Sequence, residues 1–486
     1  MKRARRQINR RSKQRGVALI MVLSTLTVLA VMLTEFQQET SVELGSALAE
    51  RDALQAEYAA RSGIALTRLV IAAEPTVRKA LLPLLMIAGM GNTQQIPIWE
   101  HADALLGLFN DEASAKAFGT LIGGIFDQTK GLGLPGARFE VTVVDEDSKL
   151  NFNFAARGTA PSRIVVATEF LSLVGSPQYD KLFSERDEQG NFNDRRTICA
   201  ALIDWTDPDT EADPCTPQAM TATQTGAEDS YYEMLKVPYS RKNAAFDSLQ
   251  EMHLVRGFGD EFWSTFVDPD PDDPERRNVT VWGSDKMNIN TASGVNIMAL
   301  VCGYLEGDSP ACSDPVIRAK VISLVEMLRS VIQGVPMFHS AGQFIKYLRH
   351  DAAKEGSTDP FDLGTLLQSL GIPSIKVKES QLKDRIKVKS DVFSIYAKGL
   401  VKSGKRETRT RIHAVVDFRG APPPGQARSE ADQAELQGAV PSPTVSLADA
   451  GIELPPGIDP SQVTSSSILS ALQASAGGRI VYFRIN

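Results

Sequence analysis

The hydrophobic pattern is uneven, with one long uncharged stretch near the N-terminus and short apolar segments among polar ones afterwards. Residues 17–33 read VALIMVLSTLTVLAVML and contain no charged side chain. At about 1.5 Å per residue of helix, this stretch covers about 26 Å, enough for the hydrocarbon core of a bilayer. The pattern therefore predicts one membrane-spanning helix.

The helical pattern continues beyond the apolar stretch. Residues 34–73 contain no proline and are rich in Ala, Leu, Glu and Arg, which are good helix formers. Apolar pairs recur four residues apart, as at Leu44 and Leu48, which is typical of one helix face. We expect a single spine helix over 17–75 that ends at Pro75.

Strand patterns lie on both sides of a long helical region. Alternating β-formers predict a strand at 139–144 and a short one near 150–153, within the region 76–156. A mostly helical domain is expected at 157–375, followed by strands within 376–420 and a last strand at 479–486. The segment 421–478 opens APPPG and predicts a flexible insertion. The fold class is α+β: a long N-terminal helix and a small antiparallel sheet, with a helical domain inserted between the strands.

Charge gives the membrane helix an orientation. The net charge is −7, yet residues 1–16 carry eight basic side chains and no acidic one. Basic residues before a membrane helix stay in the cytoplasm, so we expect a single-pass inner-membrane protein with a periplasmic body. An ordinary cleaved signal would have a shorter apolar stretch and a small-residue site after it, whereas Thr34 and Glu35 follow here. A plain membrane anchor remains an alternative.

Gly16 lies between the basic leader (1–16) and the apolar run, before Val17. This arrangement resembles the type IV prepilin signal, which implies that prepilin peptidase cleaves after Gly16 and methylates Val17. Most pilins and pseudopilins have Glu at the fifth mature position, where this chain has Met21. Lack of this Glu is typical of the K-type minor pseudopilin of type II secretion systems.

The body contains a second, separate resemblance to that K-type (GspK) family. The similar segments resemble its DWxDxD, GAEDxYY, PPYxxxN, F-S-x-EL-x-x-V-x-G and NxNTA boxes, in the same order. They are Ala201–Asp209, Gly226–Tyr232, Pro238–Asn243, Phe246–Gly257 and Asn288–Ala292, with Asn151–Asn153 as an earlier strand end. The resemblance implies a subunit at the pseudopilus tip that helps initiate assembly in protein export. It also implies partners: I- and J-type minor pseudopilins, prepilin peptidase, and the secretin or secreted substrate.

Two rival interpretations belong to other classes. A minor pilin of a type IV pilus would share the leader and spine but should lack the boxes. A membrane-anchored periplasmic enzyme would need a catalytic constellation, and the sequence has no HExxH, GxSxG or P-loop pattern. The glycines at 131–136 match GxGxxG but precede a strand, so we do not expect a dinucleotide site. We expect no enzymatic activity, and the acidic surroundings of the helix–glycine-turn segments argue against nucleic acid.

Acidic residues gather in the middle of the chain. Residues 200–275 hold 17 acids and four Lys/Arg, which predicts that internal ion pairing cannot neutralise them. Calcium prefers carboxylate and carbonyl oxygens, and the family resemblance implies calcium in the helical domain. The candidate ligands are Asp204, Asp207, Asp209, Glu228 and Asp229. A solvated acidic loop is the alternative.

The four cysteines are Cys199, Cys215, Cys302 and Cys312. They form no CxxC pair, and no histidine stands at zinc-ligand spacing. In an oxidising compartment they could form two disulfides, and short loops favour Cys199–Cys215 and Cys302–Cys312. Four buried thiols remain the alternative.

Overall fold

The structure is a computed structural model that describes most of the chain. The described residues are 4–87, 97–106, 136–184, 186, 190, 192–217, 224–227, 230–332, 336–350, 363–421 and 477–485. The chain divides into two compact units, each described below by itself. Unit 1 comprises Met1–Arg61, Phe109–Glu140 and Lys398–Arg411, and unit 2 comprises Ser62–Leu108, Val141–Ala397 and Ile412–Asn486. The flexible insertion expected at 421–478 lies almost entirely outside the described residues.

The first helix, α1, is longer than the sequence pattern predicts. It runs over Ala4–Ile87 and passes through Pro75, where we expected it to end. Proline removes one backbone donor and disfavours the helix locally, but it does not prevent good helix formers from continuing it. The segment after Pro75 reads TVRKALLPLLMI and is rich in such residues. The boundary at Pro75 is therefore wrong, and the helix extends a further three turns.

In unit 1, α1 packs tightly against the hairpin Lys398–Arg411. Ala56, Ala59 and Ala60 are fully buried. A Cβ added to Gly399 would lie 1.7 Å from the backbone oxygen of Ala56, so only glycine permits this approach. Asp52 is 1% exposed and accepts a bond from Arg406 Nη2 at 3.2 Å. A glycine contact and an ion pair thus fix the hairpin to the helix.

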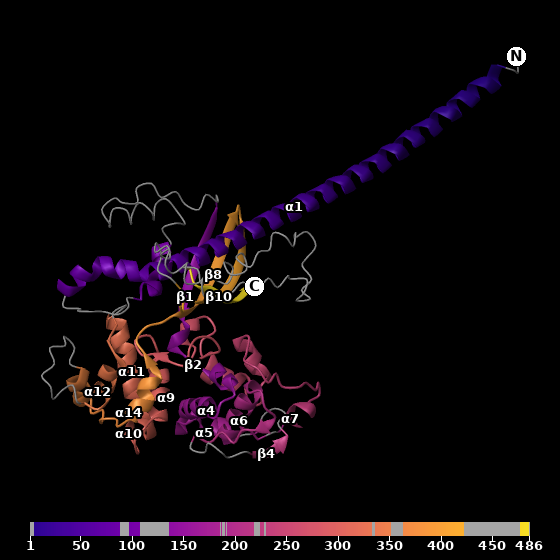
Figure 1. Ribbon diagram of the computed structural model, residues 1–486. Helices are drawn as coiled ribbons and strands as arrows, with labels where there is room; N and C mark the ends of the chain where they lie inside the picture. Colours follow the sequence, from indigo (N-terminus) through magenta and orange to yellow (C-terminus); the bar gives the residue numbers. More distant parts are fainter. Residues whose placement is uncertain are drawn as a thin grey trace, which may run out of the picture. The chain divides into compact units, whose positions relative to one another are not determined.

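The main sheet has four strands in the order β1-β8-β9-β10 (Figure 1). They are β1 Ala137–Asp145, β8 Val392–Ser403, β9 Arg406–Asp417 and β10 Arg479–Ile485. β10 is antiparallel to β9, from Arg479 opposite Asp417 to Ile485 opposite Ile412. Since β8 follows β1 in the sheet, the residues between them form an insertion. This confirms the predicted α+β class.

The insertion is mostly helical and lies in unit 2. Its α-helices are α4 Ala160–Val174, α5 Asp180–Ser184, α6 Arg195–Thr206, α7 Ser230–Glu233, α8 Asp260–Phe262, α9 Gly294–Gly303, α10 Pro310–Ser313, α11 Pro315–Ile332, α12 Ala341–Leu348, α13 Leu363–Ser369 and α14 Glu379–Asp384. α4 packs against both α6 and α9 (Figure 1). Unit 2 also contains the short helix α2 Ala102–Leu106. Phe170 and Phe258 lie in the aromatic core, where both contact Phe262.

Short strands and 3-10 helices of three to six residues complete the insertion. β2 Leu150–Asn151 pairs in parallel with β5 Val279–Thr280, and β6 Met287–Asn288 pairs in parallel with β7 Ile386–Lys387. β3 Glu211–Ala212 pairs with β4 Gln224–Ala227. Of the strands expected within 376–420, β7 therefore pairs with β6 of the insertion and not with β8.

Candidate functional site

The predicted cleavage site lies inside α1. Gly16 is helical, and a Cβ added to it would meet no atom within 4 Å. Val17 is 58% exposed, and the apolar side chains that follow it are exposed as well. Among the described residues, the helical stretch Gly16–Pro75 is the one long and apolar enough to cross a membrane. Cleavage after Gly16 stays a prediction.

The hydroxyl groups in the apolar stretch are satisfied within the helix. Ser24 donates to the Met21 oxygen at 2.9 Å, and Thr27 donates to the Ser24 oxygen at 2.8 Å. Thr25 makes the same kind of bond to the Val22 oxygen at 2.9 Å. Such bonds reduce the cost of placing polar side chains in hydrocarbon. The stretch is therefore suited to a bilayer despite its serine and threonines.

The acidic cluster follows the C-terminal end of α6. Asp204 lies in the last turn of α6, and its carboxylate accepts a hydrogen bond from the backbone amide of Asp213 at 2.7 Å. The carboxylate of Asp213 in turn accepts a hydrogen bond from the backbone amide of Cys215 at 2.7 Å. Cys215 is bonded to Cys199 on α6, with a Cα–Cα distance of 5.8 Å. The second disulfide joins Cys302 to Cys312, so the structure has the two pairs that short loops favour. Hydrogen bonds from backbone amides to the two carboxylates, together with the disulfide, thus fix the acidic loop to α6.

A cation from another helix lies among these carboxylates. Arg163, on α4, contacts Asp207 Oδ2 at 3.1 Å, Asp209 Oδ2 at 2.7 Å and Asp213 Oδ2 at 3.5 Å. The prediction that ion pairing cannot neutralise the cluster missed this partner, but one guanidinium offsets only part of the charge of three carboxylates. The prediction counted acidic and basic side chains over residues 200–275 only, and Arg163 precedes this range.

The compensation by Arg163 is incomplete. Asp207 is fully buried, and its Oδ1 has no hydrogen-bond partner among the described residues. Burial raises the pKa of Asp207 to about 6, with the negative charges of Asp209 and Asp213 adding to the effect. Burial also raises the pKa of Asp213. The loop therefore holds one buried carboxylate oxygen that a further cation could satisfy.

The predicted calcium ligands are brought together only in part. Asp204 lies in the last turn of α6 and Asp207 and Asp209 on the loop after it, whereas Glu228 and Asp229 lie outside the described residues. In the described part of the chain, no group of three or more His, Cys, Asp or Glu side chains has metal-binding geometry. The unpartnered Asp207 oxygen fits a cation, but the described ligands alone do not complete a calcium shell, which takes about six to eight oxygens.

Aromatic residues from four of the recognised boxes form one cluster. Trp205 makes an edge contact with Tyr232 at 5.6 Å, another with Tyr239 at 6.2 Å, and stacks on Phe246 at 6.4 Å between centroids. Tyr232 also accepts the Arg256 amide at 3.3 Å. These boxes therefore meet in the core of the insertion, where they build structure.

Two asparagines from the boxes act as clamps between distant segments. Asn153 donates to the oxygens of Phe246 and Val281 at 2.9 and 2.6 Å, and it accepts the Phe246 amide at 2.7 Å. Asn290 accepts the Phe338 amide at 2.8 Å and donates to the Phe338 oxygen at 2.9 Å. One side-chain amide supplies both a donor and an acceptor, so it can pair with a free backbone edge as a strand would. The role of both residues is architectural.

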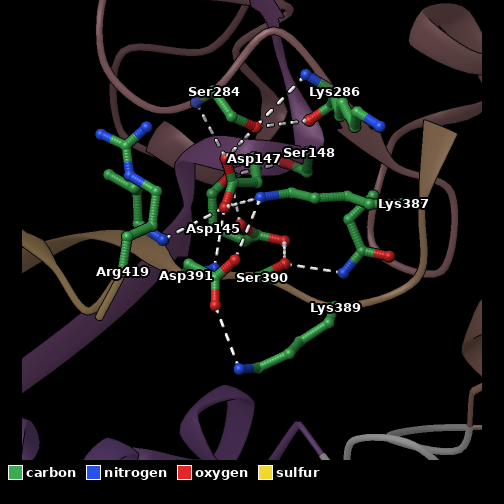
Figure 2. A network of polar contacts seen from close by, with 12 residues as sticks. Asp145, Asp147, Ser148, Ser284, Lys286, Lys387, Lys389, Ser390, Asp391 and Arg419 are labelled. Carbon is green, nitrogen blue, oxygen red and sulfur yellow. Dashed lines mark hydrogen bonds and ion pairs between the residues drawn. The ribbon is translucent and has the colours of Figure 1, made fainter. Parts of the chain in front are cut away.

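A polar network that was not among the predicted sites joins the two ends of the insertion (Figure 2). Asp147 Oδ2 accepts the amides of Asp391 and Val392 at 2.8 and 3.1 Å and lies 2.5 Å from Lys387 Nζ. Asp145 accepts bonds from the hydroxyls of Thr291 and Ser390. Burial, reinforced by the charge of Asp147, raises the pKa of Asp145 to about 7.

The comparisons with known proteins agree with the recognised boxes. Residues 173–266 match the family described as type II secretion system (T2SS), protein K. No curated protein matches the chain. One similar solved chain belongs to the crystal structure of the GspK-GspI-GspJ complex from the type 2 secretion system of enterotoxigenic Escherichia coli. It is 17% identical, with a TM-score of 0.34, and the match covers 66% of this chain and 90% of that chain.

Proposed function

We propose that the chain is a K-type minor pseudopilin at the pseudopilus tip, because residues 173–266 match the protein K family of type II secretion systems. The observation that carries the proposal is this match, which covers the boxes from Ala201 to Gly257. A minor pilin of a type IV pilus should lack these boxes. In this proposal the protein is a structural subunit that helps initiate assembly for protein export.

Two features of the chain support a tip position. The apolar stretch 17–33 contains no carboxylate, and Met21 stands where most pseudopilins place Glu. A buried carboxylate needs a partner, and in this family it is thought to pair with the terminal amine of a neighbouring subunit. A subunit without it needs no neighbour on that side. The insertion between β1 and β8 adds a bulky domain that a filament of stacked subunits would have to accommodate.

The proposal includes a location and partners. The basic leader keeps the N-terminus in the cytoplasm, α1 anchors the protein in the inner membrane, and the body lies in the periplasm. Two disulfides are suited to that oxidising compartment. The similar solved structure is a complex of GspK with GspI and GspJ, and we propose that this chain assembles with the corresponding I- and J-type subunits. At the tip it would contact the secretin or the secreted substrate.

The first test is mass spectrometry of the N-terminus, with and without co-expressed prepilin peptidase. We expect a methylated mature end at Val17 that appears only with the peptidase and is blocked by Gly16→Ala. An intact Met1 end under both conditions would refute a pilin-class subunit. Co-purification of the processed protein with I- and J-type subunits would then test the assembly.

Calcium binding is a further part of the proposal. Its support is the buried Asp207 oxygen that has no partner among the described residues, with Asp209 on the same loop and Asp204 in the last turn of α6. A bound cation would supply positive charge where burial disfavours the ionised carboxylate. Isothermal titration of the EDTA-treated protein with calcium should show binding that Asp207→Asn weakens. Unchanged binding in this variant would remove Asp207 from the ligand set.

A further inference from the structure

The outer face of the sheet in unit 1 is strongly basic. Its exposed basic side chains, called the basic face below, are Arg138 on β1, Lys398 and Lys402 on β8, and Arg409 and Arg411 on β9. Only two exposed acidic side chains, Glu140 and Glu407, share these strand segments. The whole chain has a net charge of −7, so the basic face is a local reversal of sign.

Strand pairing places two of these cations directly opposite each other. A two-residue turn, Gly404–Lys405, joins β8 to β9, so Ser403 lies opposite Arg406. Counting back along the antiparallel strands, Lys398 lies opposite Arg411. Like charges at directly opposed positions destabilise a sheet. This cost is offset only if an anionic group lies over the pair.

The chain itself supplies little negative charge to this face. Arg409 Nε pairs with Glu407 at 2.7 Å. The bond from Arg409, together with the charges of Arg138 and Lys402, lowers the pKa of Glu407. In the part of the chain that the structure describes, Arg138, Lys398, Lys402 and Arg411 form no ion pair. The five cations of the basic face therefore share two carboxylates, Glu140 and Glu407.

The opposite face of the hairpin is already occupied. Gly399 lies against the backbone of Ala56, and Arg406 pairs with Asp52 on α1. Residues at alternate positions of a strand point to opposite faces, so Lys398 and Leu400 point away from α1. A partner of unit 1 that approaches the sheet away from α1 would therefore meet the basic face.

A membrane surface is poorly placed to be that partner. The apolar stretch of α1 ends at residue 33, and the hairpin contacts α1 at Asp52 and Ala56. At about 1.5 Å per residue, the separation along the helix is about 28–35 Å. The attraction to anionic lipid falls off within a Debye length, about 8 Å at physiological salt. The occupant must therefore come from the aqueous side, as a protein does.

We propose that the basic face is a docking surface for an acidic surface of the subunit packed beside this chain in the assembly. The inference rests on the proposed function, because it needs a neighbouring pseudopilin. Lys398 and Arg411 are its central residues, and Arg138, Lys402 and Arg409 form its rim.

The test measures the affinity of the full-length protein, in detergent micelles, for purified I- and J-type subunits at about 0.05 M and about 0.5 M NaCl. At low salt we expect the double variant Lys398→Glu/Arg411→Glu to bind about tenfold more weakly than wild type, with the difference shrinking at high salt. The matched control is Lys376→Glu/Lys383→Glu, which makes the same charge change at exposed lysines of the body. This control should bind as wild type does.

A single variant separates docking from folding. Lys398→Glu places opposite charges across the strands, so we expect a melting temperature equal to or above that of wild type together with weaker binding. Equal binding by wild type and the double variant would overturn the docking surface, whereas absence of binding by wild type would refute the proposed function instead. Tighter binding after deletion of residues 422–476 would assign the basic face to an internal segment and overturn the proposal. Charge-dependent binding to phosphatidylglycerol vesicles would assign the basic face to lipid and would overturn the proposal as well.

Discussion

Asp207 offers a quantitative test of the acidic loop. It follows α6 as its C-cap, its side chain is fully buried, and Arg163 contacts one of its two oxygens at 3.1 Å. Burial raises its pKa to about 6 from the model-compound value of 3.8. Because the pKa is higher in the folded than in the unfolded state, folding takes up a proton between these values. The free energy of unfolding must therefore fall as pH rises through this window.

The magnitude follows from the shift. About two pKa units correspond to about 3 kcal/mol of stability lost once the pH exceeds 6, relative to strongly acidic solution. Since the titrations of Asp207 in the folded and the unfolded state overlap, about 1 kcal/mol of this loss of stability should fall between pH 5 and pH 7. Asp207→Asn removes the titration and keeps an oxygen that can accept the bond from Arg163.

Urea unfolding of wild type and Asp207→Asn at pH 5 and pH 7, in EDTA, measures the effect. We expect the stability of the variant relative to wild type to rise by about 1 kcal/mol from pH 5 to pH 7. Other buried acids such as Asp145 contribute the same pH dependence of stability to both proteins, so their contributions cancel in this difference. Asp308→Asn, which removes an exposed carboxylate, should show no such change. A pH-independent difference for Asp207→Asn would refute the reasoning. Added calcium should erase the advantage of the variant at pH 7 if the cation binds there.

Three further predictions concern stability. Gly399→Ala should lower the free energy of unfolding by about 3 kcal/mol and expose the hairpin to trypsin, because the added methyl meets helix backbone; Gly45→Ala, where nothing lies within 4 Å, should be neutral or stabilising. Replacing both Cys199 and Cys215 by Ser should cost about 3 kcal/mol in chemical denaturation, because the bond closes a loop with a sequence separation of 16. Lys387→Met should cost about 3–5 kcal/mol, because it leaves a buried carboxylate without its ion-pair partner; a cost below about 1 kcal/mol would contradict that pairing.

The fold could be predicted from local patterns where those patterns are strong. The uncharged stretch 17–33 and the alternating residues of β1, β8 and β9 correspond to the elements found. The prediction was wrong at Pro75, where local propensity after the proline carries α1 on to Ile87. The short strand β7 has strand-forming residues, but no sequence pattern shows that its partner is β6. Pairing depends on tertiary context that periodicity does not contain.

The site was harder to predict because charges from distant segments meet there. Arg163 precedes its partner Asp207 by 44 residues, and the bond between Asp147 and Asp391 spans 244. Counting charges within a window misses such partners. The only sequence signal for the buried network was the Asp145-Glu146-Asp147 run directly after a strand pattern. Carboxylates at that position can accept hydrogen bonds from backbone amides, but the sequence does not show which amides donate them.

The position of that network explains how the sheet accommodates so large an insertion. Asp147 follows β1, and the amides that it binds, of Asp391 and Val392, lie at the start of β8. The first and last residues of the insertion are thus held together by one buried carboxylate and its lysine. Loop-closure entropy rises only with the logarithm of loop length, so a local clamp of this kind costs little more for a long insertion than for a short one. The pairing of β1 with β8 therefore does not depend on the residues in the interior of the insertion. The helical domain can carry the recognised boxes while β1 and β8 stay paired.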